Sequence, residues 1–185
     1  SSERRERDRS ITLAAVESLL AQEGVHLRIS CVDNRSDDRS LGGRLRDLGE
    51  TVEVFDCDEP FNFSRLCNVA ATRGTDEPYL LFVNNDVELE PGALFEMLRW
   101  IDQPKIGAVG ARLFFPDGRI QHAGISIHPE ATWQEILGWG NLCCGRQAEE
   151  SGFTANPMIV DAVTGACLLV RRDIFEEVGG FDEKR

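Results

Sequence analysis

The sequence has little basic charge and no long apolar run. Its 185 residues include 20 lysines and arginines against 32 aspartates and glutamates, which gives a net charge of -12. A protein that binds a nucleic acid backbone needs a basic face, so this balance argues against nucleic acid as a partner. No apolar run approaches the roughly 18 residues that a membrane helix requires, and the first ten residues are too polar for a signal peptide. We therefore expect a soluble chain without a membrane span.

Closely spaced cysteine pairs are also missing. The six cysteines lie far apart or directly next to each other, without a C-x-x-C pair and without a histidine at zinc spacing, and this pattern argues against a structural zinc site. Cys31, Cys67 and Cys167 lie within apolar segments, where a free thiol behaves as a small hydrophobe. We expect reduced thiols and a cytoplasmic protein.

Apolar residues make up 42% of the chain, enough for the core of one domain over residues 1–185. Helical and strand patterns alternate along it. Helices are predicted over 11–22 (capped by Ser10 or Asp8), 38–48, 64–73 (capped by Ser64) and 91–101, and strands over 27–33, 51–55, 79–83 and 106–115. An irregular segment is expected over 128–160, then order over 161–172 and a short helix capped by Asp173. The alternation predicts an α/β fold, a doubly wound and mostly parallel sheet.

Polar side chains follow three of the predicted strands. The first strand ends in Asp33-Asn34, the second in Asp56 and Asp58, and the third in Asn84-Asn85-Asp86. Ligands of open α/β sheets bind beyond the carboxyl ends of the strands, so these residues predict a crevice. Its acids would repel one another without a cation, and carboxylate and amide oxygens suit Mg²⁺ or Mn²⁺ bridging a diphosphate.

Five motifs in order resemble the inverting glycosyltransferases of family 2, which have the GT-A fold, in particular bacterial members that build surface polysaccharides. The motifs are VDNRSDD, FNFSRLCNVAA, YLLFVNNDVELEPGAL, IGAVGARLFFPDGRIQHAG and VTGACLLVRRDIFEEVGGFDE. The resemblance covers nearly the whole chain. It implies transfer of a sugar from a nucleotide diphosphate donor to a hydroxyl of a glycan or lipid-linked acceptor, with inversion. It also implies a cytoplasmic location, at the inner face of the membrane if a larger parent protein brings the domain there.

The resemblance implies roles for single residues near the donor. Asp33 and Asn34 would face the nucleotide base, and Asp86 would be the metal-holding acid of a D-x-D element whose first acid is replaced by Asn84. The neighbouring Asn85 is assigned to the same substrate-binding set. Because an amide adds no charge to the metal site, this departure predicts a lower metal affinity.

Other assignments keep a structural alternative. Arg65 and Asn68 would approach the nucleotide, but both could be exposed helix residues. Thr164 and Gly165 match the acceptor-side TGA segment, and a small-residue kink in a strand is the alternative. His122 is expected to be a histidine at the core edge bonded to backbone rather than a metal or substrate ligand.

Assignments at the two ends of the chain follow from the same resemblance. In this family the catalytic base lies in an acidic motif some residues after GGFDE, so the base is expected beyond Arg185, and Asp182 is the candidate that the chain itself offers. The family's first strand should precede a segment like 7–9. We therefore expect a piece of a larger domain, truncated at both ends. Trp133 and Trp139 would stack on an acceptor sugar or simply pack their loop.

Two other functions share some of these features. A sugar-phosphate nucleotidyltransferase would use the same sheet and metal, with a glycine-rich basic loop after its first strand. A non-catalytic binding module would keep the nucleotide crevice without a base.

Overall fold

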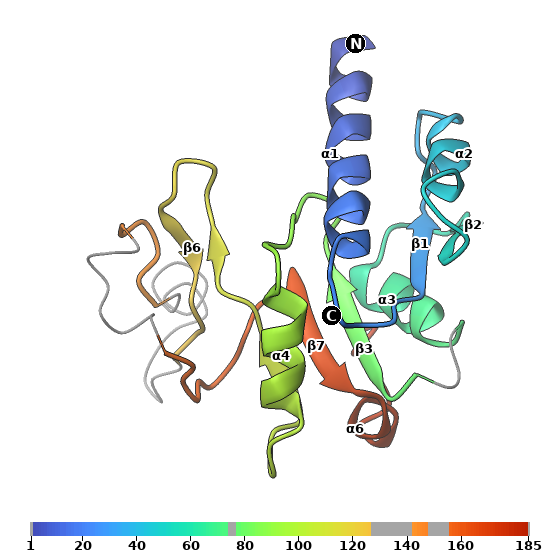
Figure 1. The fold of residues 1–185 in the computed structure, drawn as a ribbon. Coiled ribbons are helices and arrows are strands. Elements are labelled where there is room, and N and C mark those ends of the chain that lie inside the picture. Colours follow the sequence, from blue (N-terminus) through green and yellow to red (C-terminus); the bar gives the residue numbers. More distant parts are fainter. Residues whose placement is uncertain (1, 74–76, 127–141, 148–155, 185) are drawn as a thin grey trace.

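The computed structural model describes residues 2–73, 77–126, 142–147 and 156–184 (Figure 1). The elements in chain order are α1 (Ser2–Leu20), β1 (Ile29–Asp33), α2 (Leu41–Arg46), β2 (Val52–Asp56), α3 (Phe63–Ala71), β3 (Tyr79–Val83), α4 (Ala93–Ile101), β4 (Ala108–Gly110), β5 (Leu113–Phe114), β6 (Ile120–His122), β7 (Cys167–Arg171) and α6 (Arg172–Glu177). The predicted α/β alternation is confirmed over the first two thirds of the chain.

The first helix is longer than predicted. It begins at Ser2 and not at a cap on Ser10 or Asp8. Glutamate and arginine favour helices, so the charged residues before Ile11 extend the helix without an apolar stripe. In Figure 1 this half of α1 extends past the sheets, whereas its second half carries the buried residues, which are Leu13, Ala15, Val16 and Leu19.

Strand pairing is parallel in one part of the fold and antiparallel in another. β1 and β2 pair in parallel, with Ile29 opposite Val52 and Asp33 opposite Asp56. β7 lies between β3 and β4 and is antiparallel to both, so the expectation of a mostly parallel sheet is wrong for this part. The cause is the long connection after β4, which returns the chain at the carboxyl ends of β3 and β4. β7 can then only run in the opposite direction.

The strand predicted over 106–115 is divided. β4 ends at Gly110, the N–H of Ala111 donates to the carbonyl oxygen of Cys167, and the chain then forms β5, which pairs with β6. Gly110 packs against Val163 so closely that a Cβ at position 110 would lie 2.5 Å from the Cβ of Val163. No local sequence pattern predicts this tertiary contact at the end of β4.

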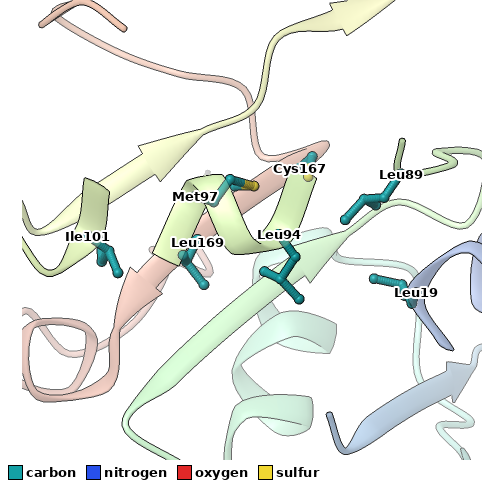
Figure 2. Packing of buried hydrophobic residues seen from close by; sticks show 7 residues of the cluster. All are labelled: Leu19, Leu89, Leu94, Met97, Ile101, Cys167 and Leu169. Carbon is teal, nitrogen blue, oxygen red and sulfur yellow. The ribbon is translucent and has the colours of Figure 1, made fainter. Parts of the chain in front are cut away.

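Three apolar clusters in the described part of the chain hold the helices on the strands. In the first, Leu94, Met97 and Ile101 of α4 pack with Cys167 and Leu169 of β7, and Leu19 of α1 and Leu89 join them (Figure 2). The second consists of Leu13, Val16, Leu45 and Val52 and joins α1, α2 and β2. The third consists of Ala71, Phe82, Leu168 and Val170 and joins α3, β3 and β7. Because α1 contributes to the first two clusters, it connects the β1–β2 sheet with the β3–β7–β4 sheet.

Helix starts depend on residues other than those predicted. Asn62 and not Ser64 caps α3, since its side chain accepts from the N–H of Arg65. α4 follows Gly92, which has a φ of 81° and offers no side-chain cap. Asp173 lies in the first turn of α6 and its carboxylate accepts from the N–H of Ile174.

All six cysteines are free thiols, as predicted. Burial raises the pKa of Cys31, Cys67 and Cys167 to about 11. No helix in the described part of the chain is long and apolar enough to cross a membrane.

Candidate functional site

The carboxyl ends of β1 and β2 are joined by side chains. The Asn34 amide donates to the carbonyl oxygens of Cys57 at 2.7 Å and Glu59 at 2.9 Å. An Asp33 carboxylate oxygen accepts from the N–H of Ser36 at 2.7 Å and shapes the loop after β1. The donor groups of Asn34 are therefore used within the protein, and its Oδ1 and the second Asp33 oxygen are the groups left for a ligand.

The end of β3 lies beside the start of β7. The N–H of Asn84 donates to the carbonyl oxygen of Ala166 at 2.9 Å, and the N–H of Val87 returns to the carbonyl oxygen of Asn84 at 3.2 Å. This tight turn leaves the side chain of Asp86 exposed to solvent. Asn85 turns toward α1 instead, since its Nδ2 donates to Thr12 Oγ1 at 3.0 Å. Asn84 and Asp86 are thus available to a ligand, while Asn85 holds the loop to α1.

Two hydrogen bonds fix the backbone of the TGA segment, residues 164–166. Thr164 Oγ1 accepts from the N–H of Ala166, and the N–H of Thr164 donates to His122 Nε2, both at 3.2 Å. His122 is only 4% exposed, so the expectation of a structural histidine bonded to backbone is confirmed. Gly165 lies against Phe63, where an added Cβ would be 3.3 Å from the ring.

Arg65, on the surface of α3, connects two acidic residues that lie outside this helix, Glu59 and Glu183. Its guanidinium forms a two-point ion pair with Glu59, with an Nη2 to Oε1 distance of 3.0 Å, and its Nη1 lies 3.3 Å from Glu183 Oε2. The hydrogen bond from Arg65 lowers the pKa of Glu59, and the two carboxylates raise that of Arg65. Arg65 is therefore held by ion pairs and is more than a solvated helix residue, while its approach to a nucleotide stays a prediction.

Asn68 holds the C-terminal segment, which we define as residues 179–184. Its amide makes two hydrogen bonds of 2.9 Å with the backbone of Phe181 and a third of 2.9 Å with Glu183. The pKa of Glu183 is lowered chiefly by the hydrogen bond from Asn68 and further by the one from Arg65. Rather than facing solvent as a helix-surface amide, Asn68 fixes the position of this segment.

Asp182 lies in the held segment and is exposed. One of its carboxylate oxygens accepts from the N–H of Lys184 at 2.9 Å. Its neighbours on both sides, Phe181 and Glu183, are bonded to α3, so the backbone of Asp182 is fixed while its carboxylate faces outward.

These contacts link the predicted residues in two series, both of which reach α3. One series of contacts runs from Asn34 through Glu59 and Arg65 to Glu183. The other runs from Asn84 through Ala166 and Gly165 to Phe63 on α3. We define the rim as the residues of these two series other than Ala166, together with the remaining site residues: Asp33, Asn34, Glu59, Phe63, Arg65, Asn68, Asn84, Asp86, Thr164, Gly165, Asp182 and Glu183. β1 and β3 point the same way in Figure 1, so their polar ends lie on the same side of the molecule.

The sequence interpretation missed two residues of this rim, Glu59 and Phe63, and included Glu183 only as part of GGFDE. Glu59 follows the second strand, as Asp56 and Asp58 do, so the same strand-end pattern could have identified it. Phe63 gave no such signal, and neither did the bonds of Glu183, because both depend on contacts between residues more than 100 positions apart in the chain.

Three residues named in the sequence predictions lie outside the described part of the chain. They are Trp133 and Trp139, expected to stack on an acceptor sugar or to pack their loop, and Arg185, beyond which the catalytic base is expected. A base after Arg185 therefore stays a prediction. Among the described acids near this end, Glu183 is bonded to Arg65 and Asn68, and Asp182, which accepts from the N–H of Lys184, remains the candidate base.

The oxygen ligands at the end of β3 suit a divalent cation held mainly by its substrate. No group of three or more histidine, cysteine or acidic side chains in the described part of the chain could hold a metal ion alone. Mg²⁺ and Mn²⁺ commonly bind through one or two carboxylates together with substrate phosphates. The exposed Asp86 carboxylate, with the Asn84 amide two residues before it, fits that mode.

A cavity of about 530 Å³ lies away from this rim, at the amino ends of β1 and β2. Its lining includes Leu27, Arg28 and Thr51, and Arg28 pairs there with Glu53 and Glu77. None of the predicted site residues lines it.

Comparison with known proteins gives a family and a fold. Residues 6–179 match Glycosyl transferase family 2. An uncharacterized protein, y4gI of Sinorhizobium fredii, is 36% identical over 94% of the chain, and the O-antigen biosynthesis protein RfbC of Myxococcus xanthus is 35% identical over 91%. The chain spans only 19% and 13% of the lengths of these two relatives.

Two more distant proteins are also similar. An N-acetylglucosaminyl-diphospho-decaprenol L-rhamnosyltransferase of Mycobacterium tuberculosis is 29% identical over 58% of the chain and 37% of its own length. Among solved structures, a mannosyltransferase of Pyrobaculum calidifontis in complex with GDP-mannose and Mn²⁺ superposes with a TM-score of 0.62 at 17% identity, over 94% of this chain and 44% of that one. At this identity the likeness is one of fold.

Proposed function

Since the chain belongs to glycosyl transferase family 2, we propose that it is the donor-binding domain of a glycosyltransferase. It moves a sugar from a nucleotide diphosphate to an acceptor hydroxyl with inversion at the sugar carbon. The observation that carries this proposal is the hydrogen bond from Asn84 to Ala166, which brings the end of β3 beside the TGA segment. A donor held at Asp86 would then lie next to residues that can meet an acceptor.

Each part of the rim has a role in this proposal. Asp33 and the Oδ1 of Asn34 bind the nucleotide base at the end of β1. Asp86, with Asn84, would hold a Mg²⁺ or Mn²⁺ ion, which when bound stabilises the negative charge of the departing diphosphate. Thr164 and Gly165 contact the acceptor, and Asp182 takes the proton of its attacking hydroxyl.

The names of the relatives support a narrower substrate class. One relative is named for O-antigen biosynthesis and another for rhamnosyl transfer to a lipid-linked sugar diphosphate. We therefore propose a role in surface polysaccharide synthesis, with a glycan or lipid-linked acceptor. Such an acceptor is met in the cytoplasm, at the inner face of the membrane.

A binding module without catalysis is the second candidate. It is favoured by the side chains of Asn68 and Asn85, which are bonded within the protein, and by Asn84 at the place of an acid. These features reduce the number of groups that remain for a donor.

A titration separates the two candidates. UDP, GDP, CDP and dTDP are titrated by calorimetry with and without Mn²⁺, and the matching nucleotide sugars are then tested for hydrolysis and transfer. Binding that depends on Mn²⁺ together with turnover supports the glycosyltransferase. Binding without turnover in the full-length protein supports the binding module, and no binding of any nucleotide contradicts both.

A further inference from the structure

Asp86 lies in a loop that has no regular structure of its own. We define the Asp86 loop as residues 84–92, between β3 and α4. Its start is fixed by the bond from Asn84 to Ala166. The far end must also be held if Asp86 is to keep one position, because exposed irregular loops are otherwise mobile.

Gln22, just after α1, holds the far end of this loop. Its Nε2 donates to the carbonyl oxygen of Glu90 at 3.1 Å, and its Oε1 accepts from the N–H of Leu94 at 3.2 Å. Nε2 also donates to the carbonyl oxygen of Ser18 at 3.1 Å, which ties the side chain to α1. At 7% exposure, Gln22 is one of two buried polar residues in the described part of the chain.

The bond to Leu94 replaces a missing helix cap. The first N–H groups of a helix lack partners within the helix, and a side chain at the N-cap usually accepts from one of them. The N-cap of α4 is Gly92, which has no side chain for this purpose. Gln22 supplies the acceptor from 72 residues away in the chain.

Two further bonds from α1 reach the same loop. Ser18 Oγ accepts from the N–H of Leu89 at 2.9 Å, and Thr12 Oγ1 accepts from Asn85 at 3.0 Å. Leu89 is buried beside Leu19 of α1 in the first apolar cluster (Figure 2). α1 therefore contacts the Asp86 loop before and after Asp86.

We infer that Gln22 is a positioning residue for donor binding: by holding Glu90 and Leu94 to α1 it keeps Asp86 where a metal-bound diphosphate can meet it. The inference rests on the proposed function for the ligand, but the hold on the loop stands on the hydrogen bonds alone. Gln22 itself is buried and touches no ligand.

The test compares Gln22→Met with the unchanged chain. Methionine is similar in length and makes none of the three bonds. We expect the amides of Leu89 and Leu94 to exchange hydrogen faster, and the Mn²⁺-dependent affinity for the nucleoside diphosphate that binds best to fall at least about threefold, the effect of losing part of one hydrogen bond. Nucleotide binding without Mn²⁺ should change less.

Two other variants make the result specific. Leu45→Ala destabilises the second apolar cluster, which does not include the Asp86 loop, and at a temperature where it is folded it should bind as the unchanged chain does. Ser18→Ala is a milder change that should accelerate exchange at Leu89 and weaken Mn²⁺-dependent binding in the same direction. If Gln22→Met does not fold, Gln22→Glu takes its place, because it keeps an acceptor for the N–H of Leu94 but loses both bonds donated by Nε2.

The outcomes are distinguishable. Unchanged exchange at Leu89 and Leu94 in the folded variants overturns the hold on the loop. Faster exchange with unchanged Mn²⁺-dependent affinity overturns the role in donor binding, and so does an equal loss in Leu45→Ala. If the unchanged chain binds no nucleotide, the proposed function fails, and the exchange data still decide whether Gln22 fixes the loop.

Discussion

The side-chain amide of Asn68 forms a pair of hydrogen bonds with the backbone N–H and carbonyl groups of Phe181. The N–H of Phe181 donates to Asn68 Oδ1 and Asn68 Nδ2 donates to the carbonyl oxygen of Phe181, both at 2.9 Å. Gly180 makes this approach possible, because it has a φ of 79° and a Cβ there would lie 2.7 Å from Asn68 Oδ1. The phenyl ring of Phe181 then packs edge-on against that of Phe82 on β3. The position of Asp182 is thus set by α3 and β3.

Asn68→Ala should release the C-terminal segment. The substitution leaves the N–H and carbonyl groups of Phe181 without their partner, which typically costs about 1–3 kcal/mol for buried groups and less where water can replace it. We expect faster hydrogen exchange at Phe181 and a lower melting temperature. Thr72→Ala is the matched control, since Thr72 is exposed at the end of the same helix and its hydroxyl donates to the carbonyl oxygen of Val69. Equal protection of Phe181 in both variants would contradict the assigned role.

Acid should loosen the same segment. The pKa of Glu183 is lowered below its ordinary value of 4.5, first by the hydrogen bond from Asn68 and then by that from Arg65. A lowered pKa in the folded state means that the ionised carboxylate stabilises the fold. This contribution is fully present above the ordinary value and is lost as the pH falls through the lowered one.

Hydrogen exchange or chemical shifts of residues 180–184 between pH 6 and pH 3 would measure this loss. Glu183→Gln keeps an acceptor oxygen for Asn68 but does not titrate, so its acid transition should be smaller. A remainder is expected from Glu59, whose pKa the bond from Arg65 also lowers. Identical transitions in the two proteins would show that Glu183 is not the titrating group.

Much of the fold could be predicted because helical and strand patterns are local. The strand at 79–83 is a continuous apolar run, and the polar residues after it are visible as a strand end. The direction of β7 could not be predicted, since it depends on where a long connection returns the chain. The close contact of Gly110 with Val163, at the point where the strand predicted over 106–115 is divided, likewise joins parts of the chain that are distant in sequence.

The polar residues at the strand ends could be identified from the sequence, but the hydrogen bonds that they form could not. Strand-end logic brings Asp33, Asn34 and Asn84 to one side of the molecule, as the structure has them. It does not reveal that Arg65 and Asn68 hold the C-terminal segment, because their partner Glu183 lies more than 100 residues away. Bonds of this kind form only when both sequence regions are already folded.

Asp86→Ala should weaken the binding of a nucleoside diphosphate in the presence of Mn²⁺ and leave the fold intact. Asp86 is exposed at the turn after β3, and surface substitutions of this kind usually change stability by no more than about 0.5 kcal/mol. Because the substitution removes the carboxylate proposed to hold the cation, we expect a loss of about tenfold or more in calorimetry with Mn²⁺. Without Mn²⁺ the two proteins should bind alike.

Glu88→Ala is the control for this experiment. Glu88 is an exposed acid two residues further along the same loop, so its removal changes the net charge by the same amount. An equal effect of both substitutions would indicate a general charge effect and contradict a specific metal role for Asp86.

Asp182→Asn should reduce sugar transfer in the full-length protein without weakening donor binding. The Asp182 carboxylate is exposed while its backbone is held between Phe181 and Glu183, the arrangement expected of a group that receives a proton from an incoming acceptor. Loss of general-base assistance typically costs about 10² to 10⁴ in rate.

Asparagine still accepts from the N–H of Lys184, so the local structure should persist. Glu176→Gln, an exposed acid on α6, serves as the control. Turnover of Asp182→Asn within a few-fold of the unchanged protein would assign the base to another carboxylate, such as one in the acidic motif expected beyond Arg185.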